Sequence, residues 1–155
     1  MTQIEPIQPK EKAIVYVLRK VEARLEVLVF DHIDYPDVDR QVPGGGIEPG
    51  ESKEKAALRE LEEESGIMNA RLIRYLGESQ YENAYQKQLQ RRHFFLVQGP
   101  EGLPNHWDHL VKSKGEDDGL AFHFYWRDLQ EAEIGYDQGE GLRYLTEEDK
   151  ERVGS

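Results

Sequence analysis

Three glutamates on one predicted helix are the residues of this chain best placed to do chemistry. They lie in the run Arg59-Glu60-Leu61-Glu62-Glu63-Glu64. Positions i, i+3 and i+4 of a helix are surface neighbours, so Glu60, Glu63 and Glu64 share one face. Like charges at this spacing repel each other, and a hard divalent cation that prefers oxygen ligands would remove the repulsion. The spacing therefore predicts a metal site on this helix.

The helix that carries these acids has clear start and stop signals. Ser52 is suited to cap its N-terminus and Gly66 to end it, so we expect a helix over Ser52–Ser65. Pro43-Gly44-Gly45-Gly46 precedes it, and glycines without a Cβ let the backbone approach the helix closely. An apolar stripe beside the acidic face should pack into the core; it consists of Ala57, Leu58 and Leu61.

The spacing of these residues resembles the complete signature of the Nudix hydrolases. It runs Gly45, five residues, Glu51, seven residues, Arg59-Glu60-Leu61, one residue, Glu63-Glu64, one residue, Gly66-Ile67, with every position in register. The resemblance implies an α/β (α+β) fold, the Nudix α/β/α sandwich, in which a mixed β-sheet carries helices on both faces. It also implies hydrolysis of a diphosphate linkage between a nucleoside diphosphate and another moiety.

The resemblance assigns metal ligands and supporting residues. Mg²⁺, or alternatively Mn²⁺, would bind to the carbonyl of Gly44 and to the carboxylates of Glu60, Glu63 and Glu64. Glu51 would support the site from the outer shell. Arg59 stands four residues before Glu63 and is expected to hold it by a charge-assisted pair.

A base must take a proton from the attacking water, which the metal would activate for attack on phosphorus. In Nudix enzymes this base is either a motif glutamate or an acid on a later loop. Here the helix candidate is Glu63. The loop candidates are Glu116, Asp117 and Asp118, just before a predicted strand, and we favour Glu116 among them.

Substrate contacts are expected on the strands after the helix. Arg91 is the candidate for phosphate, and Tyr81 and Tyr85 for stacking on a base, with core packing as the alternative. Tyr85 lies 18 residues past Ile67, similar to the tyrosine that marks dinucleoside polyphosphate hydrolases in this family. A nucleoside triphosphate or a dinucleoside polyphosphate is therefore the expected substrate. The alternative is a Nudix-like domain that binds a nucleotide as a sensor without cleaving it.

Apolar and β-branched runs elsewhere predict the strands of the sheet. The runs at 13–18 and 25–30 predict a hairpin, and the first is apolar almost throughout, which favours burial on both faces. The other expected strands are 41–43, 70–81, 87–97, 107–111 and 121–126, with short helical segments at 128–133 and 146–152.

Length and composition limit the alternatives. A chain of 155 residues fits one domain, which we place at 12–155 after a loose N-terminal arm at 1–11. Its net charge of −11 argues against a nucleic acid polymer as partner, and the absence of cysteine excludes a thiolate metal site or nucleophile. With neither a long apolar stretch nor a signal peptide, no membrane contact and a cytoplasmic location are expected. The resemblance leaves a homodimer open.

Overall fold

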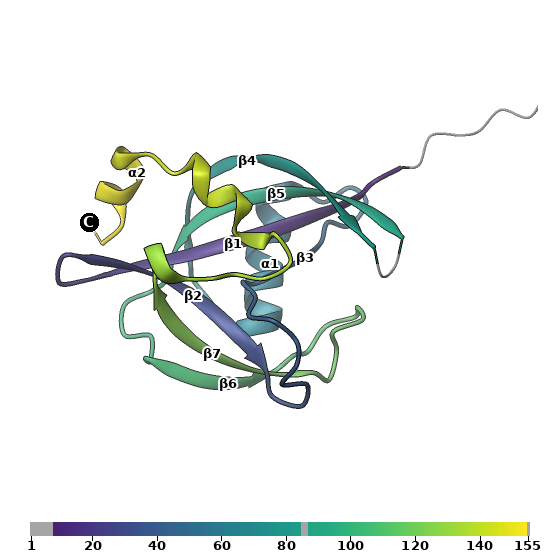
Figure 1. Cartoon of the computed structure of the whole chain (residues 1–155), viewed down its shortest axis with the longest axis horizontal. Coiled ribbons are helices and arrows are strands. Elements are labelled where there is room, and N and C mark those ends of the chain that lie inside the picture. The colour runs from purple at the N-terminus through teal and green to yellow at the C-terminus, as the bar shows by residue number, and fades with distance from the viewer. Residues whose placement is uncertain (1–7, 85–86, 155) are drawn as a thin grey trace, which may run out of the picture.

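The computed structural model describes residues 8–84 and 87–154, and its strands form one mixed sheet (Figure 1). The order across the sheet is β4-β5-β1-β2-β7-β6, with β3 paired to β1 off this path. The strands are β1 (Lys10–Val21), β2 (Arg24–His32), β3 (Gly44–Gly46), β4 (Arg71–Asn83), β5 (Gln88–Gln98), β6 (His106–Leu110) and β7 (Ala121–Asp128).

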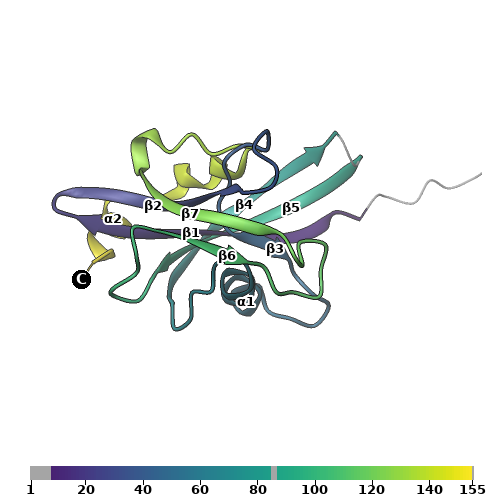
Figure 2. The ribbon, with the colours of Figure 1, turned by 90° about the horizontal axis from the view of Figure 1, so that it is seen from below.

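Helical segments lie on both faces of this sheet, which confirms the predicted fold class (Figure 2). Helix α1 (Lys53–Ser65) covers one face. The C-terminal part of the chain covers the other with two 3₁₀ helices, η1 (Leu129–Glu131) and η2 (Gln138–Tyr144), and with the short helix α2 (Glu147–Arg152). Within the described ranges, no helix is long and apolar enough to cross a membrane.

Strand β1 is buried on both faces, as its apolar sequence predicted. Residues 13–18 are all buried, and alternate side chains enter separate clusters. The cluster under α1 contains Ala13, Val15 and Val17. The opposite cluster, under the C-terminal segment, contains Ile14, Tyr16 and Leu18. The central strand therefore joins both halves of the core.

Strand β3, which we call the glycine strand, lies between β1 and β2 where these two strands separate. These two strands pair only near their hairpin, from Leu18 to Val21 on β1, and then diverge. Further along, residues 12–14 of β1 pair with β3 instead, and the amide of Val15 donates to the carbonyl of Pro43 at 2.8 Å. Of the strand expected at 41–43, only Gln41 forms a bridge, to Phe30. The strand consists of the three glycines themselves, which brings their backbone directly beneath α1.

Other boundaries differ modestly from those expected. Strand β1 already begins at Lys10, so Lys10 and Glu11 belong to the sheet and not to the expected arm, while residues 1–7 lie outside the described part. The segment η2 was not predicted, because its glycine-rich sequence has no apolar period. Tertiary contacts define it: Gly141 lies against the ring of Phe94, and its amide donates to the Tyr16 hydroxyl at 3.0 Å.

Candidate active site

Helix α1 is fixed at both ends, which sets the rotation of its acidic face. The Ser52 side chain accepts from the amide of Lys55 at 3.1 Å, and Gly66, with φ of 81°, ends the helix. Both caps are those that the sequence predicted. Because Ala57 and Leu61 are fully buried, the acids at 60, 63 and 64 turn toward the glycine strand and Glu62 faces solvent.

The glycine strand and two of the glutamates are in direct contact. The amide of Gly44 donates to Glu64 Oε1 at 2.7 Å, and Glu64 is only 3% exposed. A β-carbon on Gly45 would overlap the carboxylate of Glu60. Burial raises the pKa of Glu60 to about 7 and the pKa of Glu64 well above its usual range. Burial thus disfavours the charged form of both carboxyl groups.

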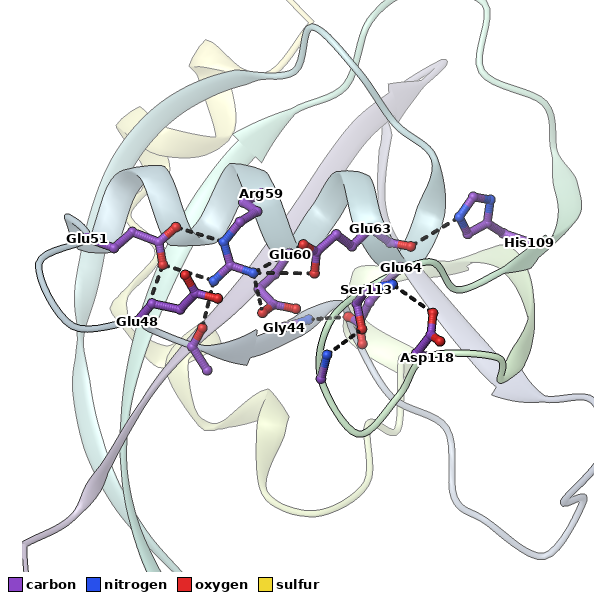
Figure 3. A network of polar contacts seen from close by, with 12 residues as sticks. Gly44, Glu48, Glu51, Arg59, Glu60, Glu63, Glu64, His109, Ser113 and Asp118 are labelled. Carbon is purple, nitrogen blue, oxygen red and sulfur yellow. Dashed lines mark hydrogen bonds and ion pairs between the residues drawn. The ribbon is translucent and has the colours of Figure 1, made fainter.

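Arg59 contacts several acids near this face, but its main partner is Glu51 and not Glu63, which the sequence predicted (Figure 3). Its guanidinium binds both oxygens of Glu51, at 2.7 and 2.9 Å, and also donates to the carbonyl of Gly46 at 2.9 Å. It donates to Glu60 at 2.9 Å, whereas its contacts with Glu63 are longer, at 3.3 and 3.4 Å. The pKa of Glu51 falls to about 2 chiefly because of the hydrogen bonds from Arg59. Arg59 therefore links Glu51 to Glu60, which lies beside Glu64. Glu63 is the acid that Arg59 holds least tightly.

The acidic face opens into a cleft of about 1110 Å³. One wall is formed by α1 and the glycine strand, and another by the loop at 112–118. Further lining comes from the ends of β1, β2, β4 and β5, from the chain on either side of β3 and from residues near η2. Four lysines line the cleft and can offset the acids; they are Lys10, Lys12, Lys112 and Lys114.

All three loop acids line the cleft, and the structure distinguishes them. Asp118 accepts from the amide of Ser113 at 3.0 Å, which stabilises the loop. Asp117 lies close enough to Glu64 for a side-chain hydrogen bond, and its charge raises the pKa of both Glu64 and Glu60. Glu116, which the sequence favoured, lines the cleft without such an effect on the pKa of either group. Asp117 is thus the loop acid whose charge acts on the pKa of both Glu60 and Glu64.

Of the expected substrate contacts, Tyr81 lines the cleft and Arg91 does not. Arg91 forms ion pairs with Glu11 at 2.9 Å and Glu78 at 3.5 Å. Its neighbour Arg92 points to the opposite face and lines the cleft in its place. Tyr85 lies outside the described residues.

Sequence reasoning missed several cleft residues. Lys10 belongs to the expected N-terminal arm, and Lys12 lies at its boundary. Tyr136 and Gln138 come from a part of the chain whose apolar residues follow neither a helical nor a strand period. Alternation along β1 could have placed Lys10 and Lys12 on one face together with Ile14.

The donor set fits a hard divalent cation. Every group at the acidic face that could bind a metal is an oxygen, which suits Mg²⁺ or Mn²⁺. Among the described residues, no three acidic, histidine or cysteine side chains already converge on one point. The guanidinium of Arg59 lies between Glu60 and Glu63 and donates to both. Mg²⁺ commonly takes only one or two carboxylates, with waters and substrate phosphates as its other ligands.

Comparison of the sequence with known proteins gives one family. The model of the NUDIX domain matches residues 9–148. The RNA pyrophosphohydrolase of Sphingopyxis alaskensis is 34% identical over 117 residues, which cover 69% of this chain and 72% of that protein. The RNA pyrophosphohydrolase of Rhodospirillum rubrum is 47% identical over 53 residues, so the match spans only 32% of that protein's length.

Solved structures share the fold. An Ap4A hydrolase from C. elegans superposes with a TM-score of 0.63 and 21% identity, covering 88% of this chain and 96% of that one. The NUDIX domain of Shewanella oneidensis NrtR, solved with ADP ribose, superposes with a TM-score of 0.61 and 15% identity, covering 88% and 87%. At this level of identity the likeness extends to the fold alone.

Proposed function

This chain belongs to the NUDIX family, a family of hydrolases, and from that premise we propose that it cleaves a diphosphate linkage in a nucleotide with the help of Mg²⁺. The contact that supports this proposal most directly is the one between the glycine strand and the acidic helix. There Glu64 binds the amide of Gly44, and Glu60 lies against Gly45. Buried acids that open into a cleft lined by lysines suit a metal ion bound to phosphates.

The metal would be held by Glu60, Glu63, Glu64 and the carbonyl of Gly44. When bound, it would neutralise phosphoryl oxygens and lower the pKa of an attacking water. The protein's own contribution is the placement of these oxygens. Arg59 fixes Glu60 while it is itself anchored by Glu51, so the carboxylates are positioned before substrate arrives.

Glu63 is the group that we assign to proton transfer. It faces the cleft, and its contacts with Arg59 are longer than those of Glu51 and Glu60, so it can accept a proton from water without breaking a short ion pair. Asp117 is the loop alternative, because its side chain reaches Glu64. Glu116 lines the same cleft and is a further loop candidate.

The substrate proposed is a nucleotide with a chain of phosphates. The sequence favours a nucleoside triphosphate or a dinucleoside polyphosphate, and the names of the relatives add an RNA with a diphosphate linkage. An RNA that carries its phosphate chain at one end would require contacts only at those phosphates and the adjoining nucleotides, which the net charge of −11 permits. The lysines on β1 and on the 112–118 loop would neutralise the phosphates.

A panel of diadenosine tetraphosphate, a nucleoside triphosphate, ADP-ribose and a 5′-triphosphorylated RNA tests the proposal, each with Mg²⁺, with Mn²⁺ and with EDTA. We expect metal-dependent release of a nucleoside phosphate or diphosphate. Glu63→Gln should lower kcat by roughly 100-fold or more. Glu62→Gln is the matched control, because Glu62 is adjacent but faces solvent. Nucleotide binding without hydrolysis would instead identify a sensor domain.

A further inference from the structure

Two side chains of the edge strand β6 hold the last turn of helix α1. The last carbonyls of a helix lack partners among the helix's own amides. Trp107 Nε1 donates to the carbonyl of Ser65 at 2.9 Å. His109 Nε2 contacts the carbonyl of Glu63 at 3.1 Å (Figure 3). One strand therefore binds the backbone on both sides of Glu64, and one of its two contacts is with the residue to which we assign proton transfer.

The carbonyl of Glu63 needs a donor from outside the helix because α1 ends soon after it. In a longer helix it would accept from the amide of Ile67, but that amide donates to the Ser65 hydroxyl at 3.1 Å. The amide of Gly66 donates to the carbonyl of Glu62 at 2.9 Å. The last turn of α1 contains no basic residue that could bind these carbonyls or offset the helix dipole. His109 thus supplies a donor that the helix lacks.

The contact between His109 and Glu63 fixes which ring nitrogen carries a proton. A carbonyl oxygen can only accept, so Nε2 of His109 must be the donor. Nε2 carries its proton in this neutral tautomer and also in the charged ring. The hydrogen bond therefore does not depend on the charge of His109.

Gly66 allows the His109 ring to lie against the end of the helix. A β-carbon on Gly66 would lie 3.1 Å from both Cε1 and Nδ1 of His109, which is closer than an ordinary contact. The same glycine adopts the left-handed conformation that ends α1. Glycine at this position is therefore favoured twice, by the backbone of the helix end and by the ring that packs on it.

The two donors stand on a firm support. Trp107 and His109 alternate with Asp108 along β6, so both face α1. The Trp107 ring stacks on Phe124 of β7, with ring centroids 5.3 Å apart, and Phe124 is fully buried. All five residues of β6 pair with β7. The position of the last turn of α1 is thus tied to the sheet.

The carboxylate of Glu63 depends on its backbone for its position. Its contacts with Arg59, at 3.3 and 3.4 Å, are the longest that Arg59 makes with the motif glutamates. Strand β6 also leads into the 112–118 loop, and the amide of Val111 between them donates to the carbonyl of Leu120 at 2.8 Å. One strand therefore locates both Glu63 and the loop that carries Asp117 on the other wall of the cleft.

From these contacts we infer that strand β6 positions Glu63 for the reaction and that His109 is the positioning residue. His109 acts on the backbone carbonyl of Glu63 and does not itself line the cleft. The inference rests on the proposed function, since the reaction is the one in which Glu63 accepts a proton.

His109→Met and His109→Gln test the inference as a pair. The two new side chains have nearly the same shape, but only glutamine has an N–H that can donate to the carbonyl of Glu63. With the substrate that the wild type cleaves fastest, His109→Met should lower kcat roughly tenfold or more, because a catalytic group displaced by about an ångström loses much of its effect. KM should stay within about twofold, since substrate contacts are unchanged. His109→Gln should restore most of kcat.

Two further variants separate positioning from folding. Trp107→Phe keeps an aromatic ring on Phe124 but removes the donor to Ser65, so it should also lower kcat more than it changes KM. His106→Met is the matched control, because His106 is an exposed histidine on the opposite face of β6. Equal values of kcat in His109→Met and His109→Gln would overturn the inference.

Backbone amide hydrogen exchange of the whole chain, measured without substrate, tests the contact independently of catalysis. The amides of Gly66 and Ile67 should exchange roughly tenfold faster in His109→Met than in the wild type, and His109→Gln should restore slow exchange. Equal exchange in the two variants would overturn the role of His109 even if hydrolysis is observed. If the wild type cleaves no substrate but exchange differs as expected, β6 holds the helix end and only the proposed hydrolysis falls.

Discussion

The carboxylate of Glu60 occupies the space that a β-carbon on Gly45 would require. Glycine at this position is therefore a condition for Glu60 to reach the glycine strand. The neighbouring Gly46 differs, because a β-carbon there would meet only the tip of Lys12, at 3.9 Å. Of these two adjacent glycines, Gly46 has room for a side chain and Gly45 does not, although both belong to the same three-residue strand.

Gly45→Ala should displace Glu60 and lower turnover by about 100-fold, the size of effect expected when a catalytic group moves by about an ångström. Gly46→Ala, which adds the same methyl group one residue away, should retain most of the activity. Rates with Mg²⁺ and thermal unfolding curves of both variants check the prediction. Equal losses of activity in the two variants would contradict it.

Glu51→Gln should weaken metal binding, although Glu51 is not itself a proposed metal ligand. Arg59 would lose its bidentate partner and would pair more closely with Glu60 and Glu63, so a cation would have to compete with the guanidinium. We expect affinity for Mn²⁺ to fall roughly tenfold or more, as for other residues that orient ligands. Calorimetric titration measures this, with the exposed Glu54→Gln in the same helix as control. An unchanged dissociation constant would show that Glu51 acts only on stability.

Adding Mg²⁺ should stabilise the folded protein, because the cation relieves repulsion among Glu60, Glu63 and Glu64. A ligand that binds only the folded state, at 100 times its dissociation constant, adds about 2.7 kcal/mol to the free energy of unfolding. Thermal unfolding followed by circular dichroism would show a higher midpoint with Mg²⁺ than with NaCl of equal ionic strength. In Glu60→Gln the difference between the two salts should shrink, and its persistence would place the cation elsewhere.

Asp149 makes stability depend on pH. It is buried, binds Arg74 through both oxygens at 2.7 Å, and caps α2 together with Thr146. The hydrogen bonds from Arg74 lower the pKa of Asp149 from 3.8 to about 2. Because the folded-state pKa is lowered, the stabilisation is complete above about pH 4 and disappears as the pH falls toward 2.

Asp149→Asn should therefore lower the free energy of unfolding by about 1 to 2 kcal/mol at neutral pH, the range for a lost helix cap and a charge-assisted bond. The difference from the wild type should diminish below about pH 4. Urea unfolding at a series of pH values measures it, with the exposed Glu147→Gln as control. A difference independent of pH would assign the effect to packing.

The predictions from sequence were strongest where local rules decide the structure. Ser52 and Gly66 bound the helix as expected, since capping depends on neighbouring backbone groups alone. The apolar run in β1 was correctly expected to be buried on both faces. The close approach of the glycines to the helix was expected because they lack a Cβ, and the structure places Glu64 and Glu60 beside them.

What the sequence could not decide was set by long-range contacts. Alternation predicts that Arg91 and Arg92 face opposite sides, but which side is the cleft depends on how β5 pairs with β1 and β4. Two register shifts in β4 add to the ambiguity. The pairing of Arg59 with Glu51 requires the turn before α1 to fold back, a geometry that spacing along the helix does not contain.

The C-terminal segment has a consequence for how the chain folds during synthesis. The core cluster around Tyr16 and Phe94 is completed by η2 and by Val153, which is 1% exposed. Every strand of the sheet and the entire acidic helix precede that segment in the sequence. A nascent chain could thus assemble its acidic helix against the sheet while the opposite face of the sheet is still exposed to water. That face closes only after Val153 has left the ribosome, so the chain exposes an apolar face that favours aggregation until then.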